Sequence, residues 1–152
     1  MATIDAHDLS RFVDAQRGVY EIALSEIRQG QKRSHWMWFI FPQYAGLGIS
    51  LTSQRYAINS AAEAEAYLNH PTLGRRLLEC TEALLRVEGR SAQQIFGSPD
   101  DTKLRSSATL FAYVSPAGSV FEQVIDKYFS GERDAKTLRL LSAPAEGVRV
   151  RT

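Results

Sequence analysis

Core-type residues repeat at helical spacing through most of the chain. Between residues 9 and 27 they stand three or four positions apart, at Leu9, Phe12, Val13, Gln16, Tyr20, Ala23, Leu24 and Ile27. This spacing puts them on one face of a helix. The pattern predicts one long helix here, with Asp8 as its N-cap and Gly30 as its C-terminal stop.

Eight further helical segments are predicted from caps, prolines and apolar spacing. Ser34 is the expected cap of the first, which Pro42 ends. Three later segments have Ser60, Ser91 and Asp134 as their expected caps. Ser98 is the expected cap of a helix whose first turn holds Pro99, Asp100 and Asp101. The segments cover residues 36–41, 52–58, 60–68, 71–85, 91–96, 98–111, 116–129 and 134–141. The expected fold is all-α: a compact single domain over residues 5–142 with about seven to nine helices, several of them short. Residues 143–152 lose the apolar periodicity and are expected to form a flexible tail.

Composition narrows the class of protein. The chain has 152 residues, 44% of them hydrophobic and 23% charged, which suits one soluble domain. A net charge of +1 argues against a nucleic-acid-binding protein. No apolar run approaches the roughly 20 residues that span a bilayer. The first residues lack a secretory signal pattern, and Cys80 is the single cysteine, so the cytoplasm is the expected compartment.

The most unusual segment is residues 34–43, SHWMWFIFPQ, which holds both tryptophans. One interpretation is a ligand platform: Trp36 or Trp38 stacks on a planar group, His35 donates or accepts a proton, and Gln43 orients a polar atom. The other is a short buried helix whose indole N–H groups bond to carbonyls. The sequence leaves both open.

A second polar segment surrounds Lys103 and Ser106. Helix N-termini bind anions, although Asp100 and Asp101 would satisfy the N–H groups here. The segment 46–50, GLGIS, matches no phosphate-binding fingerprint and fits a turn. We expect one polar cleft where His35, Gln43, Lys103 and Ser106 approach one another.

Other reactive residues have simpler interpretations. Cys80 stands on the apolar side of a predicted helix and is expected in the core. Glu63 and Glu65 are expected on a solvated face. The histidines and the cysteine have no zinc-site spacing, so no metal site and no cofactor are predicted, and no catalytic residue can be assigned.

These motifs resemble the bacterial and fungal family known as domain of unknown function 1810. The resemblance runs from about Leu9 to Leu141. It is carried by residues 32–43 (KRSHWMWFIFPQ), 46–48 (GLG), 53–58 (SQRYAI), 70–77 (HPTLGRRL), 103–107 (KLRSS) and 126–129 (DKYF). It implies a compact, mainly helical domain and no established activity. Ala108 stands where a larger apolar residue is expected. Some members are labelled calpastatin in genome descriptions, a label that does not suit a compact domain.

The order of elements also resembles, more faintly, the ADP-ribose-related N-glycoside hydrolases. The acid that this family has beside the histidine is missing, because Arg33 and Ser34 precede His35 and Trp36 follows it. That absence argues against hydrolysis.

The leading functional hypothesis is a domain that binds a small polar or nucleotide-like ligand, such as an ADP-ribose derivative. The ligand would lie in a cleft formed by residues 34–43 and 103–107, and His35, Trp36, Trp38, Gln43, Lys103 and Ser106 are the candidate ligand-binding residues. The alternative is a protein-interaction module that uses exposed aromatic residues near Trp36. The sequence does not fix the oligomeric state.

Overall fold

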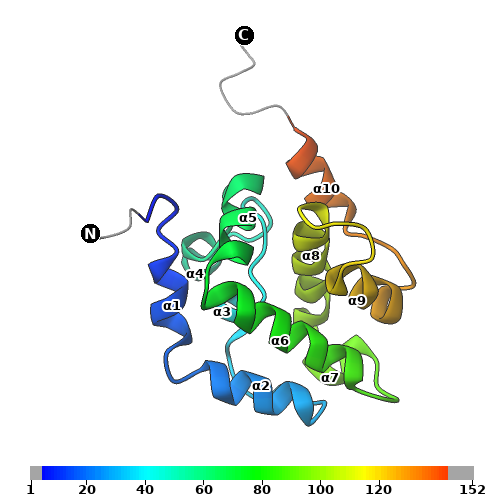
Figure 1. Ribbon diagram of the computed structural model, residues 1–152. Helices are drawn as coiled ribbons and strands as arrows, with labels where there is room; N and C mark the ends of the chain where they lie inside the picture. Colours follow the sequence, from blue (N-terminus) through cyan, green and yellow to red (C-terminus); the bar gives the residue numbers. More distant parts are fainter. Residues whose placement is uncertain (1–4, 144–152) are drawn as a thin grey trace.

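The computed structural model describes residues 5–143, and within them the chain forms ten helices and no strands (Figure 1). In chain order they are α1 (Ser10–Gln16), α2 (Tyr20–Arg28), α3 (Met37–Ile40), α4 (Leu51–Arg55), α5 (Ala61–Asn69), α6 (Leu73–Arg86), α7 (Ala92–Phe96), α8 (Asp100–Tyr113), α9 (Val120–Phe129) and α10 (Ala135–Ser142). More than half of the chain is helical, and the all-α prediction is confirmed. The predicted tail falls mostly on residues 144–152, which lie outside the described residues.

The two longest helices, α6 and α8, organise the core. α9 packs against both of them, α2 and α5 pack against α6, and α7 and α10 pack against α8. Of the residues that their spacing marks as core, Leu77, Leu84, Phe111 and Val124 are all buried. Tyr128 is only half-buried, and its hydroxyl donates to the Leu84 carbonyl oxygen at 2.6 Å.

The predicted long first helix is wrong in one respect. The chain breaks between Gln16 and Tyr20, and Gly18 adopts φ +76°, a left-handed conformation that favours glycine. Both halves bury the predicted face. The break lets α1 pack against α3 while α2 packs against α6, and it raises the nine predicted segments to ten helices.

Several predicted caps are confirmed and others are wrong. Ser60, Ser91 and Asp134 each accept a backbone N–H at the start of α5, α7 and α10. Asp8 does not cap α1; the carboxylate of Asp5 instead accepts the N–H groups of Leu9 and Ser10. Other helices start later than predicted: α3 at Met37, α8 after Pro99, and α9 after its cap Ser119.

His70 caps α6 in a way that the sequence did not predict. Its Nδ1 accepts the backbone N–H groups of Thr72 at 3.1 Å and of Leu73 at 3.2 Å. We expect His70→Ala to lower the free energy of unfolding by about 0.5–2 kcal/mol, the usual cost of a lost N-cap. His70→Asn keeps a side-chain acceptor and should lose less. Equal losses for the two variants in urea unfolding would show that the cap is unimportant.

Within residues 5–143, none of the helices combines the length and the apolar character that crossing a membrane requires.

Candidate functional site

A buried carboxylate, Glu26 of α2, fixes the segment that leads into α3. Its Oε1 accepts the backbone N–H groups of Arg33 and Ser34 and the indole N–H of Trp36, at 2.8–3.0 Å. Its Oε2 accepts the Ser34 hydroxyl at 2.6 Å. Burial favours the neutral acid, but these four hydrogen bonds outweigh it and lower the pKa of Glu26 from 4.5 to about 2.

This anchor decides which of the predicted site residues face outward. Residues 33–36 precede α3 and alternate, so that Ser34 and Trp36 turn inward while Arg33 and His35 are exposed. Trp36 has no exposed surface and packs against Phe41 and Phe96. Trp36 therefore has no face open to a ligand, and of the two tryptophans proposed to stack only Trp38 remains a candidate. The burial of Trp36 fits the alternative interpretation, although its indole N–H donates to the Glu26 carboxylate and not to a carbonyl.

Gln43 is held at the opposite end of the aromatic segment. Its carbonyl oxygen accepts the N–H of Ile58 at 2.9 Å, and the Ile58 carbonyl accepts the N–H of Ala45 at 2.8 Å. These bonds form an isolated parallel bridge between Tyr44 and Ile58. The bridge fixes the start of the 44–50 loop beside α3.

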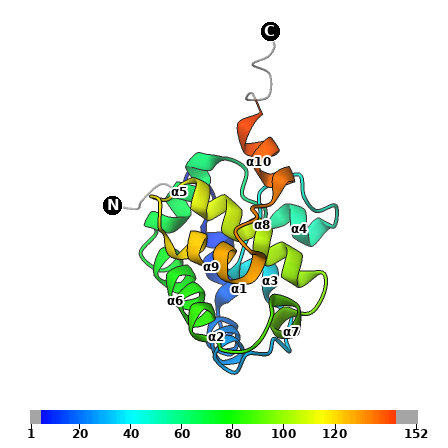
Figure 2. The same cartoon turned by 90° about the vertical axis from the view of Figure 1, so that its right-hand side faces the viewer.

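Four of the six predicted residues, Trp38, Gln43, Lys103 and Ser106, line one open cavity of about 430 Å³. His35 and Trp36 are not among the lining residues. The cavity lies between the end of α3, the 47–50 loop with α4, the first two turns of α8, and the start of α10. Figure 2 labels these four helices. The remaining lining residues are Leu47, Gly48, Ile49, Ser50, Ser53, Pro99, Thr102 and Asp134. Gly48 allows a close approach here, because a Cβ would lie 2.5 Å from the Ser53 hydroxyl oxygen.

Lys103 is the cation of this cavity. Its Nζ lies 4.6 Å from the centroid of the Trp38 ring, within cation–π range. It also lies 3.4 Å from Oδ1 of Asp100, whose Oδ2 is 2.9 Å from Nζ of Lys32. The Lys32 side chain is 8% exposed and that of Lys103 is 24% exposed. One carboxylate thus serves two ammonium groups and pairs more closely with Lys32, which leaves positive charge on the Lys103 side.

Three hydroxyl groups that line the cavity donate hydrogen bonds to backbone carbonyl oxygens. Thr102 Oγ1 donates to Pro99 at 2.7 Å, Ser106 Oγ to Thr102 at 3.2 Å, and Ser53 Oγ to Ser50 at 2.9 Å. A carbonyl oxygen can only accept, so Thr102 and Ser106 keep their hydroxyl lone pairs for other donors, whereas Ser53 Oγ already accepts the Ser50 hydroxyl at 3.0 Å. None of these three bonds pairs the hydroxyl with a basic side chain, an arrangement that suits binding better than nucleophilic attack.

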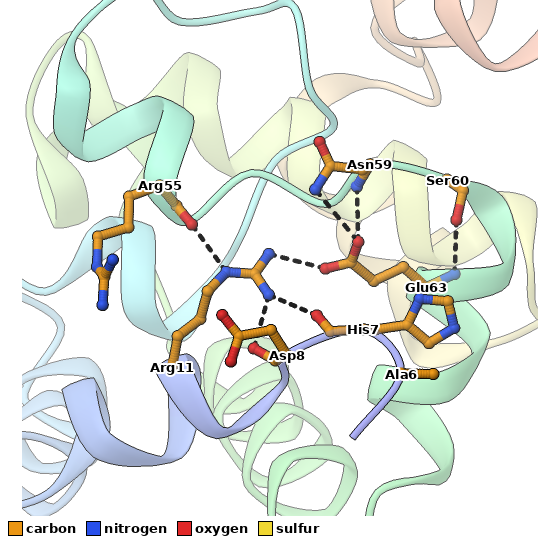
Figure 3. A pocket seen from close by; sticks show the side chains of 8 residues that line it. All are labelled: Ala6, His7, Asp8, Arg11, Arg55, Asn59, Ser60 and Glu63. Carbon is orange, nitrogen blue, oxygen red and sulfur yellow. Dashed lines mark hydrogen bonds and ion pairs between the residues drawn. The ribbon is translucent and has the colours of Figure 1, made fainter. Parts of the chain in front are cut away.

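A second open cavity, of about 560 Å³, lies between the segment before α1 and the start of α5 (Figure 3). At its base Arg11 donates five hydrogen bonds of 2.7–2.8 Å, to the carbonyls of His7, Asp8, Arg55 and Ala57 and to the Glu63 carboxylate. All five guanidinium N–H donors are used. Figure 3 shows the side chain of Arg55 pointing away from Arg11. This ion pair is a structural element rather than a site for a ligand, since the fold already occupies its polar groups.

The predicted solvated face of Glu63 is therefore wrong: the residue is 3% exposed. Asn59 donates to its Oε1 from the backbone at 3.0 Å, and Arg11 donates to its Oε2. Glu65, on the same helix, is exposed as predicted.

Cys80 is fully buried, and burial raises the pKa of its thiol to about 12, so it is a core residue as predicted. Among the described residues, no group of three or more His, Cys, Asp or Glu side chains is placed to hold a metal ion.

Sequence reasoning missed Glu26, Arg11 and Asp134 as site-forming residues. Arg11 and Glu26 stand among the apolar residues of α1 and α2. At these positions the helical spacing of the apolar residues allows a side chain to face the core. Asp134 was recognised only as a cap. Its backbone N–H donates to Thr109 of α8, 25 residues earlier in the chain, and no local sequence signal indicates this contact.

The structure is similar to one solved structure over nearly its full length. This is the crystal structure of the conserved hypothetical protein Rv1873 from Mycobacterium tuberculosis, with a TM-score of 0.90 and 51% sequence identity. The alignment covers 92% of this chain and 100% of that chain. No curated protein matches the chain. The model of the family described as "Protein of unknown function (DUF1810)" matches residues 6–141, and the chain therefore belongs to the DUF1810 family.

Proposed function

We propose that the 430 Å³ cavity binds a small, polar, anionic molecule of the nucleotide or ADP-ribose type. The observation that carries the proposal is the position of Lys103. Its ammonium group lies over the Trp38 ring and shares the Asp100 carboxylate with Lys32. Its side chain lines a cavity large enough for a small-molecule ligand. An anionic group beside Lys103 would pair with its ammonium group, which shares the Asp100 carboxylate with Lys32.

The roles of the predicted residues change accordingly. One side of the Trp38 ring carries Lys103, so the indole positions the cation in addition to forming part of the wall. Gln43 offers an amide that can both donate and accept. His35 has no role in the proposal, because it lies outside the cavity.

The alternative of a protein-interaction surface loses its central residue, since Trp36 is buried. The large apolar side chains exposed near the cavity are instead Ile49 and Leu51, which are 94% and 85% exposed. These two side chains lie beside the proposed ligand site and would contact a molecule that covers the edge of the cavity.

The proposal predicts that a ligand changes the fluorescence of Trp38. Titration with ADP-ribose, AMP and ribose 5-phosphate should give a saturable change, and Trp38→Phe should remove it while the buried Trp36 remains. A compound at a hundredfold its dissociation constant should stabilise the fold by about 2.7 kcal/mol, which thermal unfolding detects.

Lys103→Met should weaken binding of the active compound about tenfold or more, because a hydrogen bond to a charged group is lost. Lys136→Met, at an exposed position on α10 outside the cavity, is the matched control. If none of the three compounds changes either the fluorescence or the melting temperature, the proposed function is wrong.

A further inference from the structure

We infer that this cavity recognises a vicinal diol, as in a ribose phosphate, and that the carboxylate of Asp134 is the group that selects it. The inference rests on the proposed function and narrows the class of its ligand. Three features support it: the direction of the hydroxyl protons, the second oxygen of Asp134, and the spacing of these groups along α8.

The cavity presents acceptors next to its single cation. The hydroxyl protons of Thr102 and Ser106 point to backbone carbonyls, so these two hydroxyls offer lone pairs to a ligand. A bare anion would face these lone pairs unfavourably. A ligand that carries its own hydroxyl donors would satisfy them, while its anionic group meets Lys103.

Asp134 adds the strongest acceptor. Its Oδ2 accepts both the N–H of Thr137, at 2.9 Å, and the Thr137 hydroxyl, at 2.5 Å. These two bonds use the same oxygen, and Oδ1 takes part in neither. The backbone N–H of Asp134 donates to Thr109 Oγ1 at 2.9 Å, which holds the backbone of this residue against α8, while Thr137 holds the carboxylate. A fixed carboxylate can accept hydrogen bonds from two neighbouring hydroxyls.

Helix α8 sets the distance between the cation and the carboxylate. Lys103, Ser106 and Thr109 follow one another at intervals of three residues, and Thr109 holds Asp134. With a rise of 1.5 Å per residue, Lys103 and Thr109 are separated by roughly 9 Å along the helix axis. The order is thus cation, hydroxyl, carboxylate, which matches a molecule with a phosphate at one end and a diol at the other.

The test compares AMP with 2′,3′-dideoxy-AMP, which keeps the base and the phosphate and lacks both ribose hydroxyls. Binding is followed by Trp38 fluorescence and thermal shift. We expect dideoxy-AMP to bind about tenfold or more weakly, because it leaves the Asp134 carboxylate without donors. Ribose 5-phosphate should bind and inorganic phosphate should bind far more weakly.

Asp134→Asn separates recognition from folding. Asparagine is an N-cap as good as aspartate, so the melting temperature should stay close to that of the wild type. The preference for AMP over dideoxy-AMP should fall to within about threefold, because a neutral amide is a weaker acceptor for hydroxyls than a carboxylate. Lys103→Met should weaken both nucleotides by the same factor and keep the preference.

Equal affinities of the wild type for AMP and dideoxy-AMP would overturn this inference and leave the proposed function standing. A preference that persists unchanged in Asp134→Asn would also overturn it. Absence of binding by every compound would instead contradict the proposed function itself, so the two failures are distinct.

Discussion

Arg11→Met should lower the free energy of unfolding by about 3–5 kcal/mol, the range found when one partner of a buried ion pair is removed. Arg11 and Glu63 lie 2.8 Å apart, and their side chains are only 7% and 3% exposed. The substitution removes five hydrogen bonds at once and leaves the buried Glu63 carboxylate without its cationic partner. The Arg11 guanidinium also joins the segment before α1 to the end of α4 and the start of α5, so its loss should loosen three elements together.

Urea unfolding followed by circular dichroism measures this effect, with a lower midpoint and an unchanged slope. The melting temperature should fall by about 10 °C or more. Arg17→Met is a matched control at the end of α1. Arg17 pairs with Asp14 at 3.2 Å, but the two side chains are 72% and 67% exposed, so the change should stay within about 0.5 kcal/mol. If Arg11→Met costs as little as Arg17→Met, the ion pair does not hold these elements together.

The second large effect is a loss of stability in acid through Glu26. Its pKa is about 2 in the folded protein and 4.5 as the ordinary glutamate value. A carboxylate with a lowered folded pKa stabilises the fold above its unfolded pKa, and that contribution is lost as the pH falls toward the folded pKa. The contribution of Glu26 should therefore be complete above about pH 5 and decline by about 3 kcal/mol as the pH approaches 2.

Glu26→Gln isolates this contribution, because it keeps the shape of the side chain and removes the titration. The free energy of unfolding of the wild type minus that of the variant should shrink by about 3 kcal/mol between pH 6 and pH 2. Glu65→Gln, at an exposed position, controls for the removal of one negative charge. A difference that stays constant over this pH range would show that Glu26 does not anchor residues 33–36 through its charge.

The fold was largely predictable because helical periodicity is a local property. The spacing of core residues correctly indicated an all-α protein and the buried faces of α6, α8 and α9. Caps such as Ser60, Ser91 and Asp134 were found because a cap and the N–H that it accepts lie within three residues. The break at Gly18 was missed because the apolar spacing continues across it, and only the different partners of α1 and α2 require the turn.

The candidate site was predictable only in part, for the same physical reason. The sequence by itself determined the helical class, the family resemblance and the two segments that carry Trp38, Gln43, Lys103 and Ser106. It could not decide that Trp36 faces Glu26 or that His35 faces solvent, because this depends on a carboxylate ten residues away in sequence from Trp36. The Arg11–Glu63 pair spans 52 residues, and the bond that places Asp134 on α8 spans 25. Hydrophobic spacing specifies which face of a helix is buried, whereas the partner of a buried polar group depends on how distant helices pack, and that was decided only by the tertiary structure.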